Sequence, residues 1–367
     1  MKGKKVVVVD DSAFMRKLIT EFLSSHPELE VVATARNGKD AIGKIKKFKP
    51  AVITMDVEMP EMDGLDALSY IMEHMPTPIV MLSSLTGAGA ETTLQAMEKG
   101  AVDFIEKPSG TISLDLHKVK DELIGKVLAA SKANLRSVLP SVHPASCTAE
   151  ARVNQQQQHP EIKVPAFGKG KKKKNDKSIV VIGTSTGGPR ALQQVLTKLP
   201  QDTSAPILVV QHMPAGFTKS LAQRLDSISA IHVKEAEDGE ILQKGTAYIC
   251  PGNYHLKVKK AGETLIAHLD QSPPVNGHRP AVDVMFKSVS QLTDVDKVAV
   301  IMTGMGSDGT NGLIKLKETK TESVQAIAES EESCVVFGMP RAAIATRLVD
   351  CTVSVERIAE NILKYIR

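Results

Sequence analysis

Residues 178–192 read Ser-Ile-Val-Val-Ile-Gly-Thr-Ser-Thr-Gly-Gly-Pro-Arg-Ala-Leu and join a strand pattern to a helix pattern. The four β-branched residues at 179–182 are too few for a helix and are typical of a strand buried on both faces. Pro189 suits the first turn of the helix that follows. The G-x-S-x-G pattern at 183–187 predicts a nucleophile elbow in this context, with Ser185 exposed beside free amides at the helix start.

The same turn has a second interpretation. Glycine-rich turns between a strand and a helix more often cradle phosphate than hold a nucleophile. The turn lacks both the G-x-G-x-x-G pattern and the Walker lysine, which argues against a nucleotide-binding module. The motif alone does not show whether Ser185 is catalytic. The residues at the ends of the other strands are needed to decide between the two interpretations.

The composition indicates a cytoplasmic protein of two domains. A length of 367 residues exceeds one typical core, and 42% hydrophobic residues suffice for two. Aromatic residues make up only 3%, so we expect no stacking platform for nucleic-acid bases. The four cysteines are scattered without metal-like spacing, which suits a reducing compartment. No apolar run reaches the length of a signal peptide or a membrane span, so we expect no membrane insertion.

Much of the positive charge lies in one segment. The formal net charge is +4, but residues 126–177 alone hold eleven Lys or Arg against three Asp or Glu. This segment also contains four consecutive glutamines and almost no periodic apolar pattern. We therefore expect a flexible, solvated linker at 126–177, between domains at 1–125 and 178–367.

The first domain alternates between strand and helix patterns. Five strands alternating with five helices predict an α/β fold with a doubly wound, five-stranded parallel sheet. Such sheets bind ligands outside the carboxyl ends of their strands. The predicted strands are 6–9, 30–35, 51–56, 78–83 and 102–106, and the predicted helices are 13–24, 40–48, 65–75, 91–99 and one from about 113.

Polar residues follow four of these strands, namely Asp10, Asp11, Asp56, Ser83 and Lys107. The three carboxylates form an oxygen-rich site suited to Mg²⁺. The hydroxyl and the ammonium group opposite them could hold the oxygens of a phosphoryl group. Taken singly, Asp11 could instead be a helix N-cap and Lys107 a solvent-exposed lysine.

Three motifs of this half resemble response-regulator receiver domains. They are Val-Asp-Asp at 9–11, Met-Asp-Val-Glu-Met-Pro-Glu-Met-Asp-Gly at 55–64 and Glu-Lys-Pro at 106–108. The resemblance implies that Asp56 accepts a phosphoryl group. Phe104 falls at the position of the family's switch aromatic, although an ordinary core position explains it equally well. The remaining site residues implied are Asp10, Asp11, Asp56 and the backbone carbonyl of Glu58 for Mg²⁺, and Ser83 and Lys107 for the phosphate.

A second alternating pattern begins after the linker. Buried parallel strands are predicted at 179–182, 207–211 and 298–303, followed by helices near 190–199, 218–225 and 310–317. Short strands at 246–250, 255–259 and 264–268 interrupt them, the last two joined by a turn at 261–262. This domain should have a mostly parallel sheet with an antiparallel portion.

A serine, a histidine and an aspartate follow strands of this second sheet. Ser185, His212 and Asp308 should converge on one rim, because the carboxyl ends of parallel strands meet at one edge. A serine nucleophile needs a base, and the base needs an acid that orients it. The order Ser, His, Asp differs from that of the α/β-hydrolases. Glycines around Met305 would let its backbone amide approach an oxyanion.

Other assignments of these residues stay open. His278 is a second candidate base, with Asp283 as a competing acid. The Pro-rich surroundings of His278 predict a loop rather than a strand end, so His212 is preferred, although that loop could line the site. Asp308 could also cap a helix, and His212 could be a polar residue at a strand end.

Four motifs of the second half resemble the chemotaxis protein-glutamate methylesterases of the CheB family. They are Gly-Thr-Ser-Thr-Gly-Gly-Pro from 183, Gln-His-Met-Pro from 211, His-Arg-Pro-Ala-Val-Asp-Val from 278 and Thr-Gly-Met-Gly-Ser-Asp-Gly from 303. The resemblance implies hydrolysis of γ-methyl esters of glutamate on chemoreceptors, commonly with deamidation of receptor glutamines. It also implies a chemotaxis histidine kinase as phosphodonor, and no cofactor for the esterase reaction. The linker is longer than the family leads us to expect.

The CheB resemblance assigns one role to each residue of the second site. Ser185 is the nucleophile, His212 the base and Asp308 the orienting acid, and the Met305 amide is an oxyanion donor. A response regulator that binds DNA is the alternative, but residues 178–367 lack a clear helix-turn-helix or basic face. We therefore expect an esterase that the receiver inhibits until Asp56 is phosphorylated.

Overall fold

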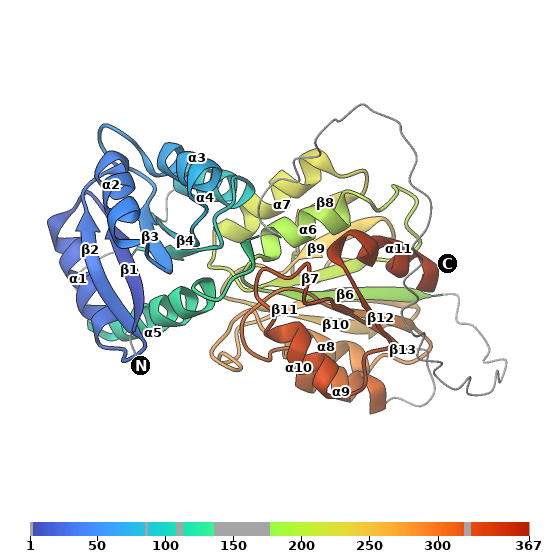
Figure 1. Ribbon diagram of the computed structural model, residues 1–367. Coiled ribbons are helices and arrows are strands. Elements are labelled where there is room, and N and C mark those ends of the chain that lie inside the picture. Colours follow the sequence, from blue (N-terminus) through green and yellow to red (C-terminus); the bar gives the residue numbers. More distant parts are fainter. Residues whose placement is uncertain (1–2, 85–86, 108–112, 136–176, 319–323, 367) are drawn as a thin grey trace, which may run out of the picture.

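The computed structural model describes residues 3–84, 87–107, 113–135, 177–318 and 324–366, which form two α/β units (Figure 1). The first unit contains a five-stranded sheet of order β2-β1-β3-β4-β5, in which every pairing is parallel. The doubly wound parallel fold predicted for this half is confirmed. Its strands are β1 (Lys4–Val9), β2 (Leu29–Ala35), β3 (Val52–Asp56), β4 (Ile79–Ser83) and β5 (Asp103–Glu106).

Helices cover both faces of this sheet. On one face α1 (Ala13–Ser24) packs beside α5 (Ser113–Ala130). On the other, α2 (Gly38–Phe48), α3 (Gly64–His74) and α4 (Gly87–Glu98) lie in a row. Because both faces are covered, β3 and β4 are buried along their whole length, which explains why their sequences are mainly apolar. Helix α5 continues to Ala130, five residues beyond the limit expected from the sequence.

The second unit is built on a seven-stranded parallel sheet of order β14-β13-β12-β6-β7-β9-β8. The glycine-rich turn after β6 and the ends of β7 and β12 therefore lie side by side at the centre of one edge. The strands are β6 (Ser178–Thr184), β7 (Ile207–Gln211), β8 (His232–Glu235), β9 (Thr246–Ile249), β12 (Asp296–Ile301), β13 (Val324–Glu329) and β14 (Cys351–Val353).

The antiparallel portion expected in this half is a separate two-stranded sheet. It consists of β10 (His255–Ala261) and β11 (Thr264–Asp270), joined by a turn in which Gly262 has a φ of 59°. The hairpin packs on α8 (Val282–Ser290), beside α9 (Thr310–Glu318) and α10 (Met339–Ala345). The opposite face of the main sheet carries α6 (Gly188–Leu196), α7 (Phe217–Ile228) and α11 (Val355–Tyr365).

Alternate side chains of β6 enter two different apolar cores. Ile179 and Val181 join the core under α8, whereas Val180 and Ile182 join the core under α6 and α11. A strand that is buried on both faces has no polar positions, which accounts for the β-branched run in its sequence. The elbow that follows β6 therefore stands on a rigid, fully packed base.

The two units touch through α4, β5 and α5 of the first. Helix α4 packs against α6 and α7, beside which it lies in Figure 1. Arg224 on α7 donates to Glu98 on α4 at 2.8 Å, and the ring of Phe104 lies 4.7 Å from that of Phe217. Phe104, which the sequence left as switch aromatic or core residue, is buried in this contact.

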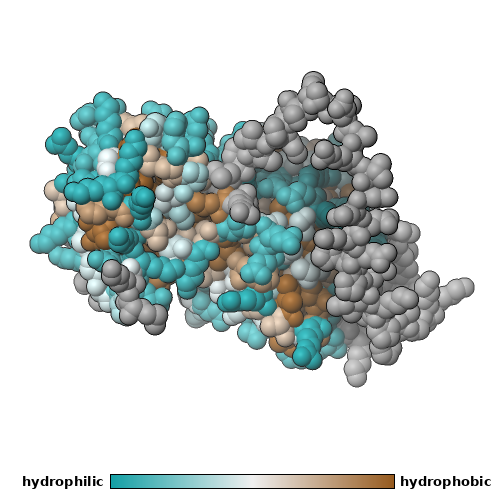
Figure 2. Space-filling view, in the orientation of Figure 1, coloured by the Kyte–Doolittle hydropathy of each residue, from teal (hydrophilic) through white to brown (hydrophobic). Residues whose placement is uncertain are grey.

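The described helices give no sign of a membrane span: each is too short or too polar to cross a bilayer. On the face shown in Figure 2, hydrophobic residues lie in separate patches between hydrophilic ones. The apolar surface on this face is therefore divided rather than continuous.

Candidate active site and phosphorylation site

The turn between β6 and α6 contains two glycines at positions where a side chain would be strained or crowded. Gly187 has a φ of 79°, and a Cβ there would lie 2.6 Å from the Cβ of Val335. A Cβ on Gly188 would collide with the side-chain oxygen of Gln211. The chain turns sharply here, and Ser185 lies half-buried at the sheet edge, less exposed than the elbow prediction expected.

Ser185 is fixed by its own backbone. Its amide donates to the carbonyl of Thr303 at 3.0 Å, and its carbonyl accepts from Gly188 at 2.8 Å. The side chain of Gln211 donates to the carbonyls of both Ser185 and His212, at 3.0 and 3.1 Å. This amide bridges the ends of β6 and β7 and holds the serine beside the histidine. Gln211 directly precedes His212, but no sequence pattern marked it as a residue of the site.

His212 contacts Asp308 directly. Its Nε2 lies 2.8 Å from Asp308 Oδ2, and both side chains are buried, with 7% and 2% of their surface exposed. The other ring nitrogen, Nδ1, is buried and has no hydrogen-bond partner within the described residues. The carboxylate fixes the proton on Nε2, so Nδ1 is the nitrogen left to accept one.

Asp308 keeps its charge because backbone amides surround it. Its carboxylate accepts hydrogen bonds from the amides of Val282 at 2.7 Å and Asp283 at 3.0 Å, at the first turn of α8. Burial alone would raise its pKa, but the bonds from His212 and these amides lower the pKa to about 2. The helix start is also favourable for a negative charge. Asp308 is thus ionised at any pH at which a protein of this kind works.

The competing residues occupy different positions. Asp283 is fully buried, and its Oδ1 accepts from the amides of Gly309 at 3.0 Å and Gly312 at 2.7 Å at the start of α9. It therefore holds a helix and does not contact His212. The ring of His278 stacks on that of His212 at 3.9 Å, and burial lowers its pKa to about 4. His278 lies in a loop that lines the site, as the sequence suggested.

Met305 lies on the loop after β12. The neighbouring Gly304 packs so closely on the elbow that a Cβ there would lie 2.8 Å from the Cβ of Ser185. The Gly304 carbonyl accepts from Gly338 at 3.0 Å and Met339 at 2.8 Å, which fixes the loop from the far side. The Met305 backbone is therefore held next to Ser185, and its side chain is 39% exposed.

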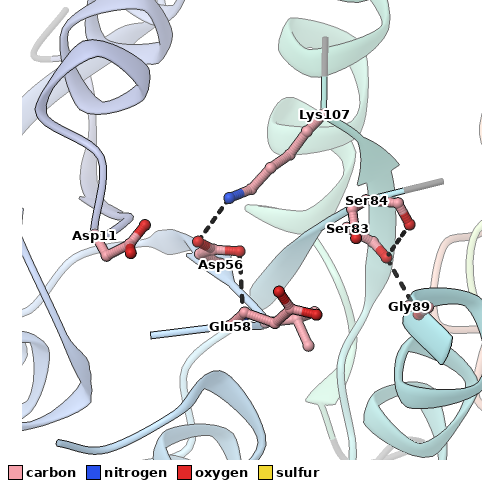
Figure 3. Close-up of a pocket in the computed structure, with 8 residues that line it drawn as sticks. Asp11, Asp56, Glu58, Ser83, Ser84, Gly89 and Lys107 are labelled. Atoms are coloured by element: carbon pink, nitrogen blue, oxygen red, sulfur yellow. Dashed lines mark hydrogen bonds and ion pairs between the residues drawn. The ribbon is translucent and has the colours of Figure 1, made fainter. Parts of the chain in front are cut away.

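A second polar site lies at the edge of the first sheet. Asp11, Asp56, Glu58, Ser83 and Lys107 line a cavity of about 160 Å³ (Figure 3). Lys107 Nζ lies 2.6 Å from Asp56 Oδ2 and 3.1 Å from Asp10 Oδ2. Carboxylate oxygens of Asp10, Asp11 and Asp56 all lie within 4.8 Å of one another. Three clustered carboxylates beside a polar cavity are a donor set that fits Mg²⁺.

The electrostatics of this site fit a bound cation. Burial raises the pKa of Asp56 to about 6, and the negative Asp10 adds to the increase, although Lys107 opposes it. The carboxyl groups repel one another, and a divalent cation would relieve that repulsion. The amide of Glu58 donates to Asp56 Oδ1 at 3.3 Å, which directs the other oxygen toward the cavity.

Ser83 lies at the cavity but its hydroxyl is engaged elsewhere. It accepts from the hydroxyl of Thr93 at 2.6 Å and donates to the carbonyl of Gly89 at 3.2 Å, both on α4. Figure 3 shows Ser83 turned toward Gly89 rather than toward Asp56. The predicted phosphate contact of Ser83 would therefore require this hydroxyl to leave α4.

Comparison with known proteins places both halves of the chain. A model of the CheB methylesterase family matches residues 180–362, and a model of the response regulator receiver domain matches residues 6–117. A protein of Geobacillus kaustophilus named protein-glutamate methylesterase/protein-glutamine glutaminase is 57% identical over 366 residues, which cover 100% of this chain and 99% of the relative. The chain belongs to the CheB methylesterase family.

Other members of the CheB family agree over the same extent. A relative of the same printed name from Bacillus subtilis is 51% identical over 99% of this chain and 98% of its own. The crystal structure of the Thermotoga maritima CheB methylesterase catalytic domain superimposes with a TM-score of 0.50 at 46% identity. It covers 52% of this chain and 99% of the solved one. The second α/β unit described above is thus the CheB methylesterase part of the chain.

Proposed function

We propose that this chain is a phosphorylation-activated hydrolase that acts in the cytoplasm on chemoreceptors. It removes methyl esters from glutamate side chains and deamidates glutamines. Residues 1–125 form the receiver, whose last helix α5 runs on to Ala130; the rest of 126–177 forms the linker and 178–367 the catalytic domain. The proposal is supported by the family of the chain and by the names of its full-length relatives. One observation carries the catalytic part: a serine on a strained turn beside a histidine that contacts a buried carboxylate at 2.8 Å.

The proposed reaction uses the geometry of the elbow. The Ser185 hydroxyl gives its proton to His212 Nδ1 while its oxygen bonds to the γ-carbonyl carbon of the substrate. The Met305 amide donates to the oxygen that becomes negative. His212 then gives the proton to the leaving methoxide, and methanol departs. Water hydrolyses the acyl-serine by the same proton route, and a glutamine substrate would release ammonia instead.

This proposal is tested by following both products. The full chain, incubated with Mg²⁺, a small phosphodonor and membranes containing methylated receptors, is expected to release methanol. Membranes whose receptors carry glutamine at the same sites are expected to release ammonia. Receptors with alanine at those sites are the matched control and should release neither. A chain that releases no methanol from methylated receptors under these conditions would disprove the assigned activity.

The receiver half is proposed to accept a phosphoryl group on Asp56 from a chemotaxis histidine kinase. Asp10, Asp11, Asp56 and the backbone carbonyl of Glu58 would hold Mg²⁺, which when bound neutralises phosphoryl oxygens. Lys107 already contacts Asp56 at 2.6 Å and would bind a phosphoryl oxygen instead. The cavity of about 160 Å³ beside Asp56 leaves room for the group.

We propose that the receiver blocks the esterase by contacting the catalytic rim itself. The hydroxyl of Thr186, the residue after the nucleophile, donates to the carboxylate of Asp103 on β5. The Met305 methyl group lies within 3.2 Å of where a Cβ on Gly125 of α5 would stand. The Thr186 hydroxyl of the elbow and the Met305 side chain of the oxyanion loop thus both lie against the receiver, which would hinder a receptor helix in reaching Ser185.

A partly buried ion cluster stiffens the receiver side of this contact. Lys126 Nζ lies 2.9 Å from Glu122 and 3.5 Å from Asp103, and it donates to the Phe104 carbonyl at 2.7 Å. Burial opposes its charge, but the two carboxylates raise the pKa of Lys126 above its usual range. Asp103 is thereby held in place to accept the hydrogen bond from the Thr186 hydroxyl.

The phosphorylation site is connected to this interface through Ser83 and α4. A phosphoryl group on Asp56 would draw the Ser83 hydroxyl away from Thr93 and Gly89. Those two residues lie on α4, whose far end carries Glu98 in the ion pair with Arg224. A shift of α4 would therefore weaken the packing against α7 and release the catalytic rim.

Removing the Asp103 carboxylate is expected to raise the activity of the unphosphorylated chain. A hydrogen bond to a charged group contributes about 1.5–3 kcal/mol, so Asp103→Ala should increase basal methanol release about tenfold or more. Asp121→Ala removes an exposed carboxylate of the same domain and is the matched control. An unchanged basal rate in a folded Asp103→Ala protein would show that this contact does not restrain the esterase.

A further inference from the structure

We infer that Glu329 is a positioning residue for the esterase reaction: its buried carboxyl group holds the Thr303 amide and thereby aligns the turn of Ser185 with the loop of Met305. The inference rests on the proposed function, and it concerns a residue that lies outside the Ser-His-Asp constellation. Glu329 ends β13 and is 1% exposed, and among the described residues its carboxyl group contacts no positive group, which is rare for so buried a glutamate.

The carboxyl group of Glu329 replaces a missing strand contact. The parallel pairing of β12 with β13 stops at Ile301 and Ala328. Thr303 lies two residues further along, and its amide donates to Glu329 Oε2 at 2.7 Å. A buried amide without an acceptor would be costly, so the side chain takes the role that a backbone carbonyl has in the ladder.

Thr303 in turn contacts the elbow at three successive residues. Its carbonyl accepts from the Ser185 amide at 3.0 Å and from the Thr184 hydroxyl at 2.9 Å. Its own hydroxyl donates to the carbonyl of Thr186 at 2.9 Å and accepts from the Val336 amide at 3.0 Å. The position of the nucleophile therefore depends on one threonine, and that threonine depends on Glu329.

The same threonine begins the loop of the oxyanion donor. Gly304 and Met305 follow it directly, and Gly304 packs on Ser185. A displacement of Thr303 would change the distance between Ser185 and the Met305 amide. Misplacement of reacting groups by about 1 Å costs on the order of 100-fold in rate, without loss of the groups themselves.

The acceptor role of Glu329 does not require a charge. Burial raises its pKa to about 7, against hydrogen bonds from Thr303 and Ser333 that lower it. The Ser333 hydroxyl lies 3.0 Å from Oε1, so a proton on that oxygen still leaves Oε2 free to accept from Thr303. Glutamine offers the same carbonyl oxygen, whereas methionine has nearly the same length and offers none.

The test compares these two replacements in the full chain, activated with Mg²⁺ and a small phosphodonor, on membranes with methylated receptors. Glu329→Met is expected to lower kcat for methanol release about 100-fold and to change KM less than about threefold. Glu329→Gln should keep kcat within about threefold of the original chain. Glu331→Met, an exposed glutamate two residues away, is the matched control. A merely structural role would lower the amount of active protein and leave kcat per folded site unchanged.

Each outcome separates this inference from the proposed function. Wild-type kcat in Glu329→Met, or equal losses in Glu329→Met and Glu329→Gln, would overturn the positioning role while Ser185→Ala stays inactive. If Ser185→Ala were active, the proposed function itself would fail. Should Glu329→Met not fold, Glu329→Leu carries the test, since leucine also offers no acceptor to the Thr303 amide. A kcat in Glu329→Leu at least tenfold below that of Glu329→Gln supports the inference, and equal kcat values contradict it.

Discussion

Replacing Ser185 or His212 with alanine is expected to lower the turnover of methyl-ester hydrolysis by about 10,000-fold or more. Ser185→Ala removes the atom that bonds to the substrate, and His212→Ala removes the group that accepts its proton. Both side chains lie at strand ends that the packed sheet holds in place, so the proteins should fold normally. Initial rates of methanol release from methylated receptor membranes, with Ser227→Ala as an exposed serine control, measure the effect.

Asp308→Asn is expected to lose less activity than either alanine variant, because the acid orients the imidazole and does not react. Three outcomes would contradict the assignment. Near-original methanol release by Ser185→Ala would exclude serine catalysis. An inactive His278→Ala beside an active His212→Ala would transfer the base to the stacked histidine. A loss in Asp308→Asn that exceeds both alanine variants would mean that unfolding, rather than chemistry, dominates it.

Asp56→Asn is expected to abolish the response of the full chain to a phosphodonor. Asparagine cannot accept the phosphoryl group, so Ser83 keeps its bonds to α4 and the receiver stays on the catalytic rim. With Mg²⁺ and acetyl phosphate, methanol release by the original chain should rise on the order of 10-fold to 100-fold, which corresponds to about 1.4–2.7 kcal/mol of interface free energy. The Asp56→Asn chain should stay at the basal rate.

Residues 178–367 expressed alone provide the control for this second experiment. Without the receiver, the catalytic domain should release methanol faster than the unphosphorylated full chain and should ignore the phosphodonor. Equal rates for the two would refute inhibition by the receiver and leave direct stimulation or receptor targeting. An Asp56→Asn chain that still accelerates would place the phosphoryl group on another residue.

Much of the fold follows from short-range patterns in the sequence. The β-branched runs of β1, β6 and β12 are buried on both faces, so they are continuous and easily recognised. Strands at the sheet margins escaped the analysis: β8 alternates as His-Val-Lys-Glu and is only partly buried, and β14 has three residues. A short marginal strand is defined by its neighbour rather than by its own sequence.

Helix α8 shows a different limit. Its sequence begins directly after Pro280, in a segment that we took only as a loop, and no side-chain cap marks its start. The carboxylate at that start belongs to Asp308, which is 26 residues away from Val282 along the chain. A cap supplied from so far away leaves no local signal, so propensity and capping rules cannot find it.

The candidate site was predictable where a residue type and a strand end coincide. Ser185, His212 and Asp308 were predicted in this way; in the structure His212 contacts Asp308, and Gln211 links the backbone carbonyls of Ser185 and His212, while the catalytic roles stay a prediction. The choice between Asp308 and Asp283 was not decided by sequence, because both precede or begin a helix and only the tertiary contact with His212 separates them. Gln211 and Glu329 act through backbone groups, which carry no sequence pattern of their own.

The interface between the two halves was beyond prediction for a related reason. Two of its polar residues are Asp103, which precedes Phe104, and Thr186, which follows Ser185. Nothing in the sequence around either residue marks it as part of an interface. A contact between segments 83 residues apart depends on how two finished domains meet. Surface complementarity of that kind cannot be obtained from hydrophobic periodicity.

The first turns of α8 and α9 are held by two buried carboxylates, one of which belongs to the proposed catalytic acid, Asp308. Asp308 accepts from amides at the start of α8, while Asp283 on α8 accepts from amides at the start of α9. Neither helix can unwind at its first turn without depriving these two buried carboxylates of hydrogen-bond donors. Amides on this side of the site should therefore exchange hydrogen only when the whole domain opens. If the receiver leaves the catalytic rim on activation, as proposed, the start of α8 can stay in place, so Ser185 would become accessible while Asp308 keeps its contact with His212.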